Sequence, residues 1–533
     1  MTHLPFGAWR RPSPLLRGGA LATALLVAGL AAAPSALAQR GQRPERPPAQ
    51  AATQAPSGET PPARPATAPQ RKLPADSTTD QTVDLPGRTL RFKATAGSIP
   101  LNNGDDGSLI AEVAYVAFVM SGDARRPVTF VFNGGPGAAS AYLNLGAIGP
   151  WRLPLDRIAI SSPPQLVPNG ETWLDFTDLV FIDPPGTGYS RIAASGDDVR
   201  RRLWSVDGDA DALAVFIRKW IEQEGRQTSV KFIAGESYGG FRAPKVARKL
   251  QGQGVGVRGL VMISPVLDFA GFGERQHAPM SWVAHLPSMA AAALDAKGQY
   301  SRDAVREVER YAAGDYLLDF LKGERDSEAV ARMSARVAAL TGLDPALVKR
   351  LAGRVDGGTF QRELHRSQRL IGSAYDPNVT AYDPHPTSAD SHYSDPVLDD
   401  TRAPITAAMT DLYQRVLNWR VERPYELLNH EVSSRWDWGR GRVGPEVMDD
   451  LRNNLAGDPQ VRVLVVHGAN DLVTPYFGSQ LLLDQLPVYG SADRLKLAVY
   501  AGGHMFYNRD ASRQAFREDT AAMFRAALAG TGE

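Results

Sequence analysis

The 533-residue chain contains no cysteine. This absence excludes disulfide bridges, thiolate metal ligands and a lipidated cysteine anchor. A protein of this length without disulfides has to be stabilised by its own hydrophobic core. Hydrophobic residues make up 43% of the sequence, which is the share expected of an ordinary globular protein.

An excess of charge of either sign is also missing. The 59 Lys and Arg residues almost balance the 58 Asp and Glu residues, which leaves a net charge of +1. Proteins that bind nucleic acid or an anionic membrane surface usually carry a basic excess or a basic cluster. The composition therefore predicts neither nucleic acid nor an anionic membrane surface as a partner.

The N-terminus has the pattern of an export signal. Three arginines precede the apolar residues 19–33, and a small-residue motif ends at Ala38. We expect residues 1–38 to be a signal peptide cleaved after Ala38, which predicts a periplasmic or secreted protein without a stable membrane anchor. An uncleaved anchor is the alternative, but the apolar run is short and Pro34 interrupts its end.

Composition also divides the rest of the chain. Residues 39–80 are rich in Pro, Ala, Gln and Arg and poor in large apolar side chains, which predicts a disordered linker. Apolar runs that end in turn residues fill 81–269 and return in 441–533, whereas 270–440 has the pattern of helices and Pro-rich loops. We therefore expect a catalytic core in two parts, interrupted by a helical cap.

Strand-like and helix-like segments alternate in this core. Residues 88–93 and 110–120 are expected to form antiparallel strands, and residues 207–223 have helical spacing. Further strands are expected within 178–188, 230–240, 259–268, 461–475 and 495–505. Strands rich in Val, Ile and Phe that alternate with helices predict a mostly parallel sheet buried on both faces.

Ser237 lies in GESYG (235–239), which fits the G-x-S-x-G pattern. An expected strand precedes it and an expected helix follows, as in a nucleophile elbow. The pattern alone is weak evidence, and a serine hydroxyl is a poor nucleophile without a base. The interpretation therefore depends on a histidine and an acid at suitable positions.

His504 is the best candidate base among the nine histidines, because two glycines link it to an expected strand. Asp471 follows the preceding strand, which gives the order Ser, Asp, His of an α/β-hydrolase. Alone, Asp471 would be interpreted as a turn residue, and His467 as a structural residue at a strand end. The three strand-end positions together predict a triad in which Asp471 orients the imidazole.

Residues 133–140, NGGPGAAS, follow another expected strand and offer backbone N–H groups that can stabilise an oxyanion. A phosphate-binding loop is the alternative interpretation. It lacks the Lys-Ser/Thr ending, however, and Pro136 removes one donor.

Three features of the insertion stay open. His385 and His392 flank an Asp-containing loop, but their spacing fits no known metal-site pattern, and no metal or cofactor is predicted. AYDP occurs at 374–377 and 381–384, which indicates turns. Four tryptophans in or near the insertion either line a side-chain pocket or pack in the core; these are Trp282, Trp419, Trp436 and Trp438.

NGGPG, GESYGG, the Asp of GANDLVTP and GGHM together resemble the serine carboxypeptidase family (peptidase family S10), in order across 83–533. The cap matches only loosely, and the chain resembles a divergent, bacterial-type member. The resemblance implies an α/β-hydrolase fold with a mostly parallel central sheet and an inserted, mainly helical cap. It implies the triad Ser237, Asp471 and His504, with the backbone N–H groups of Gly135 and Tyr238 as oxyanion donors.

The family also recognises the free C-terminal carboxylate of a peptide. The resemblance transfers this role to Asn133, Gly134 and Glu236. Val131, however, stands where the family has a Trp, and Ala147 where it has a second Glu. Two neighbouring carboxyls can share a proton, so we expect the lone Glu236 to be ionised at neutral pH. This predicts a weaker preference for acidic pH than is usual in the family, or an altered selectivity for the end group of the substrate.

The sequence thus predicts an exported serine-type carboxypeptidase that releases C-terminal residues from peptides through an acyl-enzyme. An esterase or acyltransferase, or a hydrolase of C-terminal amides and esters, is the alternative on the same triad, because fold and triad do not fix the acyl group. A non-catalytic binding protein is a third interpretation, which the intact triad disfavours. The sequence carries no sign of an oligomeric state.

Overall fold

A computed structural model describes residues 72–529, apart from 105, 123–124, 156–159, 195, 272–276, 389–394 and 442. The described residues belong to one unit of the chain, Thr67–Glu533. The predicted signal peptide, its cleavage after Ala38 and most of the predicted linker lie outside the described residues. Within the described ranges, no helix has both the length and the apolar character needed to cross a membrane.

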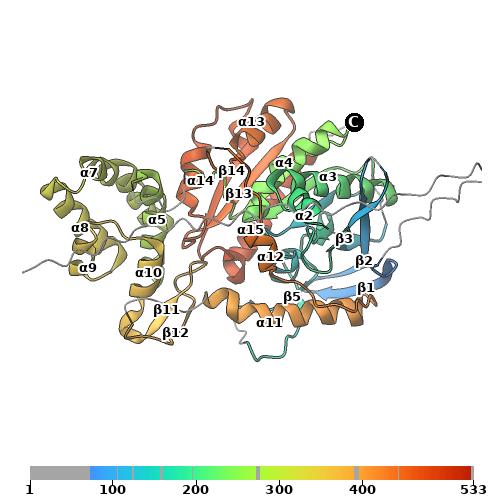
Figure 1. The fold of residues 1–533 in the computed structure, drawn as a ribbon, viewed down its shortest axis with the longest axis horizontal. Coiled ribbons are helices and arrows are strands. Elements are labelled where there is room, and N and C mark those ends of the chain that lie inside the picture. The colour runs from blue at the N-terminus through green and yellow to red at the C-terminus, as the bar shows by residue number, and fades with distance from the viewer. Residues whose placement is uncertain are drawn as a thin grey trace, which may run out of the picture. The chain divides into compact units, whose positions relative to one another are not determined.

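A ten-stranded sheet forms the centre of this unit (Figure 1). Its order is β1-β2-β3-β7-β4-β9-β10-β13-β14, and β8 pairs with β3. The strands are β1 (Ser77–Leu85), β2 (Arg88–Asn102), β3 (Leu109–Met120), β4 (Val128–Phe132), β7 (Asp178–Ile182), β8 (Arg191–Ile192), β9 (Lys231–Glu236), β10 (Gly259–Ile263), β13 (Arg462–Gly468) and β14 (Leu495–Tyr500).

The pairing divides the sheet into an antiparallel and a parallel region. β1, β2, β3 and β7 pair antiparallel. From β7 through β4, β9, β10 and β13 to β14, every neighbouring pair is parallel. The mostly parallel sheet predicted from the apolar runs is therefore confirmed.

The parallel strands are mostly apolar because helices cover both faces of the sheet. Alternate side chains point to opposite faces, so Val131 and Phe130 enter different hydrophobic clusters. The Phe130 cluster includes α3 (Val206–Gln223), α4 (Tyr238–Gly252) and α13 (Met448–Gly457). The Val131 cluster includes α11 (Pro396–Asp411) and α15 (Asp510–Ala529).

The folded region begins earlier than the sequence indicates. β1 starts at Ser77, inside the predicted linker 39–80. It pairs with β2 along its whole length: Ser77 lies opposite Ala96 at one end, and Leu85 lies opposite Arg88 at the other. In β1 only Val83 and Leu85 are buried, so backbone hydrogen bonds at the sheet edge order a segment with few apolar side chains. The predicted end of the linker is therefore corrected to a position before Ser77.

The predicted insertion 270–440 consists of two parts. The first is a group of helices with a hydrophobic cluster of its own, which also includes Tyr476 and Phe477 of α14 (Tyr476–Leu483). Figure 1 shows this group beside α14. Its members are α5 (Pro279–Asp295), α6 (Arg302–Tyr311), η4 (Ala312–Tyr316), α7 (Leu317–Lys322), α8 (Ser327–Thr341), α9 (Pro345–Arg350) and α10 (Gly357–Leu364).

The second part of the insertion packs against the sheet. Ile405 and Met409 of α11 and Leu412 of η6 (Leu412–Val416) lie in the same cluster as Val131. The remaining elements are short: α1 (Ala141–Leu143), η1 (Asn144–Ile148), β5 (Trp151–Arg152), β6 (Val167–Pro168), η3 (Trp173–Asp175), α2 (Asp197–Leu203), η5 (Arg366–Gln368), β11 (Leu370–Gly372), β12 (Thr380–Tyr382), α12 (His430–Ser434), η7 (Ala492–Arg494) and η8 (Phe506–Asn508).

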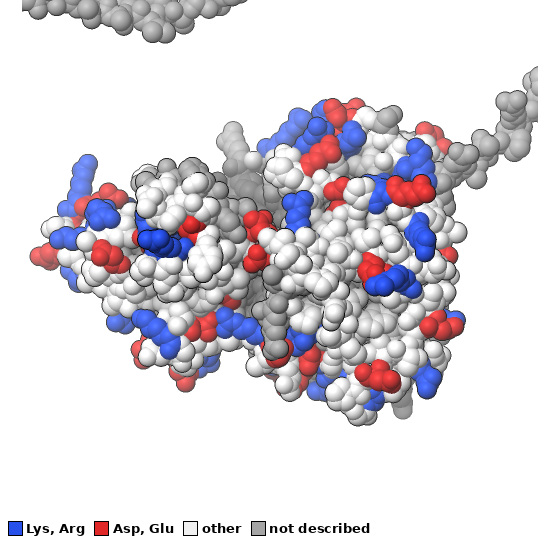
Figure 2. Space-filling view, turned by 90° about the horizontal axis from the view of Figure 1, so that it is seen from below, with Lys and Arg blue, Asp and Glu red and all other residues white. Residues whose placement is uncertain are grey.

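Charges of both signs are mixed on the face shown in Figure 2. Basic and acidic side chains of the described residues alternate there over short distances. Neither sign gathers there into a continuous field of the kind that steers a strongly charged partner.

Candidate active site

The three residues of the predicted triad follow strands of the parallel part of the sheet. Ser237 comes directly after β9, Asp471 follows β13, and His504 follows β14. The carboxyl ends of parallel strands meet at one edge of a sheet, which is where open α/β folds bind their ligands. The structure thus brings the three predicted side chains to one edge.

Ser237 occupies a strained turn between β9 and α4. Its φ of 60° and ψ of −123° are rare for a residue with a side chain, and its N–H donates to the Ile263 carbonyl at 2.8 Å. A Cβ on Gly235 would lie 2.1 Å from the Gly239 carbonyl oxygen, and a Cβ on Gly239 would lie 2.7 Å from the Phe132 oxygen. The two glycines of G-x-S-x-G therefore allow the close backbone approach that a nucleophile elbow requires.

Asp471 and His504 form a buried pair. His504 Nδ1 lies 2.7 Å from Asp471 Oδ2, and the imidazole is 2% exposed. Asp471 Oδ1 also accepts from the Val473 and Thr474 N–H groups, and the Thr474 hydroxyl donates to Oδ2 at 2.7 Å. A proton on Nδ1, directed at Asp471, leaves Nε2 free to act as the base.

The pKa of His504 is raised above its ordinary value of 6.5. Burial alone would lower it, but the charge of Asp471 and its hydrogen bond, together with the charge of Glu236, outweigh burial. Among the described residues Ser237 Oγ makes no hydrogen bond to His504; in catalytic sites this contact commonly tightens only when substrate binds.

Backbone contacts fix the loop that carries His504. Its N–H donates to the Tyr375 carbonyl at 2.6 Å, and its carbonyl accepts from the Ser264 hydroxyl at 2.8 Å. The Tyr375 ring lies edge-on to the imidazole with centroids 5.2 Å apart. Ser264, Thr474 and Tyr375 were not among the predicted site residues, although Tyr375 belongs to the first AYDP, which was interpreted only as a turn.

The two predicted oxyanion donors lie close together. A Cβ on Gly134 would lie 2.5 Å from the Tyr238 nitrogen, so the NGGPG loop packs directly on the elbow. Within the described part of the chain, neither Gly135 N–H nor Tyr238 N–H donates a hydrogen bond. Two free donors of this kind beside the serine are suited to a developing oxyanion.

Glu236 and Asn133 form a second buried pair beside the triad. Asn133 Nδ2 donates to Glu236 Oε2, and Asn133 Oδ1 accepts from the Leu143 N–H at 3.0 Å. The other carboxyl oxygen, Oε1, accepts from the Tyr507 hydroxyl at 2.8 Å. Glu236 is 2% exposed and Asn133 3% exposed. The structure therefore joins two of the predicted carboxylate-binding residues and adds Tyr507, which the sequence analysis missed.

The expected charge of Glu236 has to be corrected. Burial raises its pKa to about 7, against the opposing effects of the His504 charge and of the Tyr507 and Asn133 hydrogen bonds. Near pH 7 both protonation forms are therefore populated, and below it the neutral form dominates. The expectation of an ionised Glu236 rested on the missing second carboxyl at Ala147 and did not take burial into account.

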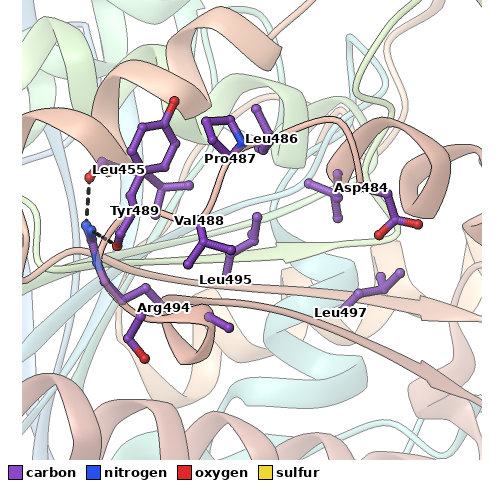
Figure 3. A pocket seen from close by; sticks show the side chains of 12 residues that line it. Leu455, Asp484, Leu486, Pro487, Val488, Tyr489, Arg494, Leu495 and Leu497 are labelled. Carbon is purple, nitrogen blue, oxygen red and sulfur yellow. Dashed lines mark hydrogen bonds between the residues drawn. The ribbon is translucent and has the colours of Figure 1, made fainter.

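A cavity of about 270 Å³ adjoins the histidine side of the site. Tyr375, which contacts His504, and the chain neighbours of His504, Gly503 and Met505, line this cavity, although no triad residue does. The rest of its lining combines apolar and polar groups, among them Val397, Asp400, Thr401 and Arg509. A second cavity, of about 330 Å³, lies between α13, α14 and β14, where Arg494 donates to the carbonyls of Leu455 and Tyr489 (Figure 3). None of the triad residues lines this second cavity.

The tryptophans named above have different surroundings. Trp419 is buried among core aromatic rings, including Tyr189 and Tyr413. Trp436 and Trp438, in contrast, stand edge-on to the ring of Tyr238, with centroids 5.3 and 5.8 Å apart. These two contact the residue directly after the nucleophile.

The structure brings no metal-binding group together among the residues that it describes: no cluster of three or more His, Asp or Glu side chains is suited to a metal ion there. The N–H of His385 donates to Asp383 Oδ1 at 2.8 Å. His392 lies outside the described residues.

Comparison with known proteins agrees with these motifs. Residues 86–267, which include the NGGPG loop and Ser237, match the family model "Serine carboxypeptidase". Over this segment, which is less than half of the chain, the protein is similar to the serine carboxypeptidase family. Asp471 and His504 lie beyond the matched segment, and their assignment rests on geometry.

Two curated relatives carry the printed name pheromone-processing carboxypeptidase KEX1. The one from Pyricularia oryzae is 34% identical over 131 residues, or 24% of this chain and 19% of the relative. The one from Fusarium vanettenii is 32% identical over 177 residues, or 31% of this chain and 26% of the relative. The similarity to each relative thus spans about a quarter of its length or less.

A solved structure shows the same fold over a longer stretch. The prohormone-processing carboxypeptidase Kex1(delta)p from Saccharomyces cerevisiae aligns with 81% of this chain and 91% of its own, at a TM-score of 0.55 and 15% identity. At this identity the likeness establishes the fold alone. The predicted α/β-hydrolase fold is confirmed.

Proposed function

We propose that this protein is a serine carboxypeptidase that removes the last residue of a peptide through an acyl-enzyme, as a divergent, bacterial-type member of its family. The observation that carries the proposal is the buried pair of Asn133 and Glu236 beside Ser237. A triad alone serves many acyl-transfer reactions. A polar end-group site next to the nucleophile is what a carboxypeptidase needs in addition.

The triad geometry supports a two-step reaction. Ser237 Oγ attacks the carbonyl carbon of the last peptide bond while His504 Nε2 takes its proton. The N–H groups of Gly135 and Tyr238 stabilise the tetrahedral oxyanion, and its collapse breaks the C–N bond. The leaving amine receives the proton from His504, and water then cleaves the ester on Ser237 by the same sequence of proton transfers.

The end-group site would hold the free carboxylate of the leaving residue. A neutral Glu236 can donate a hydrogen bond to that carboxylate, whereas an ionised Glu236 would repel it. The cavity beside His504 offers space for the side chain of the leaving residue. Peptides with a free C-terminus are therefore the proposed substrates, and no cofactor enters the reaction.

We propose further that the protein is exported and cleaved after Ala38, as the sequence predicts. N-terminal sequencing of the mature protein recovered from the periplasm or the medium tests this. A first residue of Gln39 is the expected result, and an intact N-terminus in the cytoplasm would contradict it.

A hydrolase of C-terminal amides or esters is the second candidate. Val131 and Ala147 replace two of the family's end-group residues, and this departure favours a less strict requirement for a free carboxylate. Rates on one N-blocked dipeptide as free acid, amide and methyl ester separate the candidates. At pH 6 the carboxypeptidase proposal predicts a higher kcat/KM for the free acid than for the amide. A higher kcat/KM for the amide would support the second candidate.

A further inference from the structure

Tyr507 and Asn133 together satisfy both oxygens of the Glu236 carboxyl. The Tyr507 hydroxyl donates to Oε1 at 2.8 Å, and Asn133 Nδ2 donates to Oε2. The three side chains come from separate segments: Asn133 follows β4, Glu236 ends β9, and Tyr507 lies in η8 just after His504. Tyr507 is fully buried, so its hydroxyl is held at this position by the surrounding structure.

The ring of Tyr507 packs closely against η1. A Cβ on Gly146 would lie 2.9 Å from Cε2 of this ring, so only glycine leaves room for it. The next residue is Ala147, which is buried and which stands where the resemblance to the family leads us to expect a second Glu. The Tyr507 carbonyl accepts from Arg513 Nη1 at 3.0 Å, which fixes the backbone on the other side.

We infer that Tyr507 is a positioning residue that replaces the missing second carboxyl: it holds Glu236 in place so that the Glu236 carboxyl can hydrogen-bond the C-terminal carboxylate of a peptide. This inference rests on the proposed carboxypeptidase function and explains how the site works without the second Glu. The hydroxyl acts through Glu236, because its one proton is already directed at Oε1.

A tyrosine in this role leaves one titrating carboxyl where the family has two. Burial and the charge of Glu236 raise the pKa of Tyr507 well above its ordinary value, so the hydroxyl stays protonated. The other groups that act on Glu236 are Asn133, by its hydrogen bond, and the charges of His504 and Asp471. Tyr142 and Tyr375 face it as well, since its charge raises the pKa of each.

The Tyr507 hydrogen bond favours the ionised form of Glu236. Its removal by Tyr507→Phe should therefore let Glu236 stay protonated to higher pH. A hydrogen bond to a charged group typically shifts such a titration by about one pH unit. The substitution keeps the size of the ring, so the packing against Gly146 is retained.

The test compares Tyr507→Phe with the parent protein on one N-blocked dipeptide, as free acid and as methyl ester, between pH 5 and 9. We expect the alkaline decline of kcat/KM for the free acid to move upward by about one pH unit, with KM for the acid raised about threefold to tenfold at pH 6. For the ester, kcat/KM should stay within about twofold, because the ester presents no carboxylate to Glu236.

Tyr476→Phe is the matched control. Tyr476 is another fully buried tyrosine whose hydroxyl donates to a glutamate, Glu309 Oε1, at 2.6 Å, in the cluster of the helical insertion. This variant should lose a comparable hydrogen bond but keep both pH profiles. Gly146→Ala is a second test, because the added methyl group displaces the Tyr507 ring without removing its hydroxyl. It should produce the same acid-specific change.

Unchanged acid profiles in Tyr507→Phe and Gly146→Ala would overturn the inference. Equal losses on acid and ester would overturn it too, because they would report a general defect of the site. If the parent protein cleaves the ester but not the acid, the proposed function itself fails, and the inference falls with it. If only the inference fails, the parent protein cleaves both the free acid and the ester, and the pH profile of Tyr507→Phe on the free acid is the same as that of the parent.

Discussion

His504 Nδ1 lies 2.7 Å from Asp471 Oδ2, with both side chains buried at the carboxyl end of the sheet. Asp471 accepts three further hydrogen bonds, from the Val473 and Thr474 N–H groups and from the Thr474 hydroxyl. These hydrogen bonds fix the carboxylate independently of the imidazole, and the carboxylate in turn fixes the imidazole. Such a pair orients a base at no further cost when the reaction begins.

Asp471→Asn tests this orientation. The amide oxygen can still accept the N–H groups of the turn, but the amide NH₂ stabilises the wrong imidazole tautomer. We expect kcat to fall by about 10⁴-fold with little change in the thermal midpoint of unfolding. Steady-state rates with the ester substrate and a melting curve check this, and a loss below tenfold would contradict the assigned role.

The pH dependence should differ between free acids and esters. The pKa of His504 is raised above 6.5, so both substrates lose activity on the acid side as the base becomes protonated. The pKa of Glu236 is about 7, because of burial, so acid substrates should also lose activity above about pH 7 as Glu236 ionises. A bell-shaped profile is expected for the acid, and for the ester only the rise.

Glu236→Gln is the control for this profile, because a glutamine cannot ionise. The alkaline decline on the free acid should disappear in this variant. The ester should still show only the rise, moved to lower pH because the Glu236 charge no longer raises the pKa of His504. Identical profiles for acid and ester in the parent protein would contradict the assignment of Glu236 to the end-group site.

Asp183 predicts a pH dependence of stability. Burial raises its pKa from 3.8 to about 7, against hydrogen bonds that include the Ser140 N–H at 2.8 Å. The folded protein therefore holds a proton that the unfolded chain releases, so the free energy of unfolding falls as pH rises from about 4 to 7. Asp183→Asn removes this loss, and the variant should gain about 3 kcal/mol relative to the parent between these pH values.

Urea denaturation at pH 4.5 and at pH 8 measures this difference. The free energy of unfolding of the variant, relative to that of the parent, should be higher at pH 8 than at pH 4.5, and the sign of this difference decides the test. The same difference at both pH values would show that Asp183 is ionised in the folded protein at pH 4.5.

The fold and the triad could be predicted from the sequence because both depend on short local patterns. An apolar run followed by glycines marks the ends of β9, β13 and β14, and these ends carry Ser237, Asp471 and His504. Parallel pairing then brings the three together without further information. The weak point was β1, where alternation with few apolar side chains at a sheet edge resembles a linker.

Tyr507, Thr474 and the burial of Glu236 could not be predicted in the same way. Each depends on contacts between segments far apart in the chain: Tyr507 and Glu236 are 271 residues apart. Periodicity shows which face of an element is apolar, but not which polar group meets a buried carboxyl. The same limit applies to α11, whose apolar face resembles that of a cap helix but packs on the core.

Arg242 supports the end-group site through the backbone of Asn133. Its guanidinium contacts Asp209 Oδ2 at 2.5 Å and donates to the Asn133 carbonyl at 2.7 Å, and both charged side chains are 1% exposed. Arg242→Met leaves Asp209 buried without its partner, which should lower the free energy of unfolding by about 3–5 kcal/mol. Urea denaturation at pH 7 measures the change.

Arg306→Met is the matched control on the surface, where Arg306 and Asp303 form an exposed ion pair at 2.7 Å. Its loss should change the free energy of unfolding by less than about 1 kcal/mol. Equal effects of the two substitutions would show that the Arg242–Asp209 pair contributes no more than a surface pair.

The central claim is that Ser237 is the nucleophile of this site. Its most direct test is fluorophosphonate labelling of the full protein, followed by mass spectrometry of the peptide that carries the adduct. We predict a single adduct on Ser237, labelling that rises with pH as His504 loses its proton, and no labelling of Ser237→Ala. An adduct on another residue, or undiminished labelling of Ser237→Ala, would contradict the account.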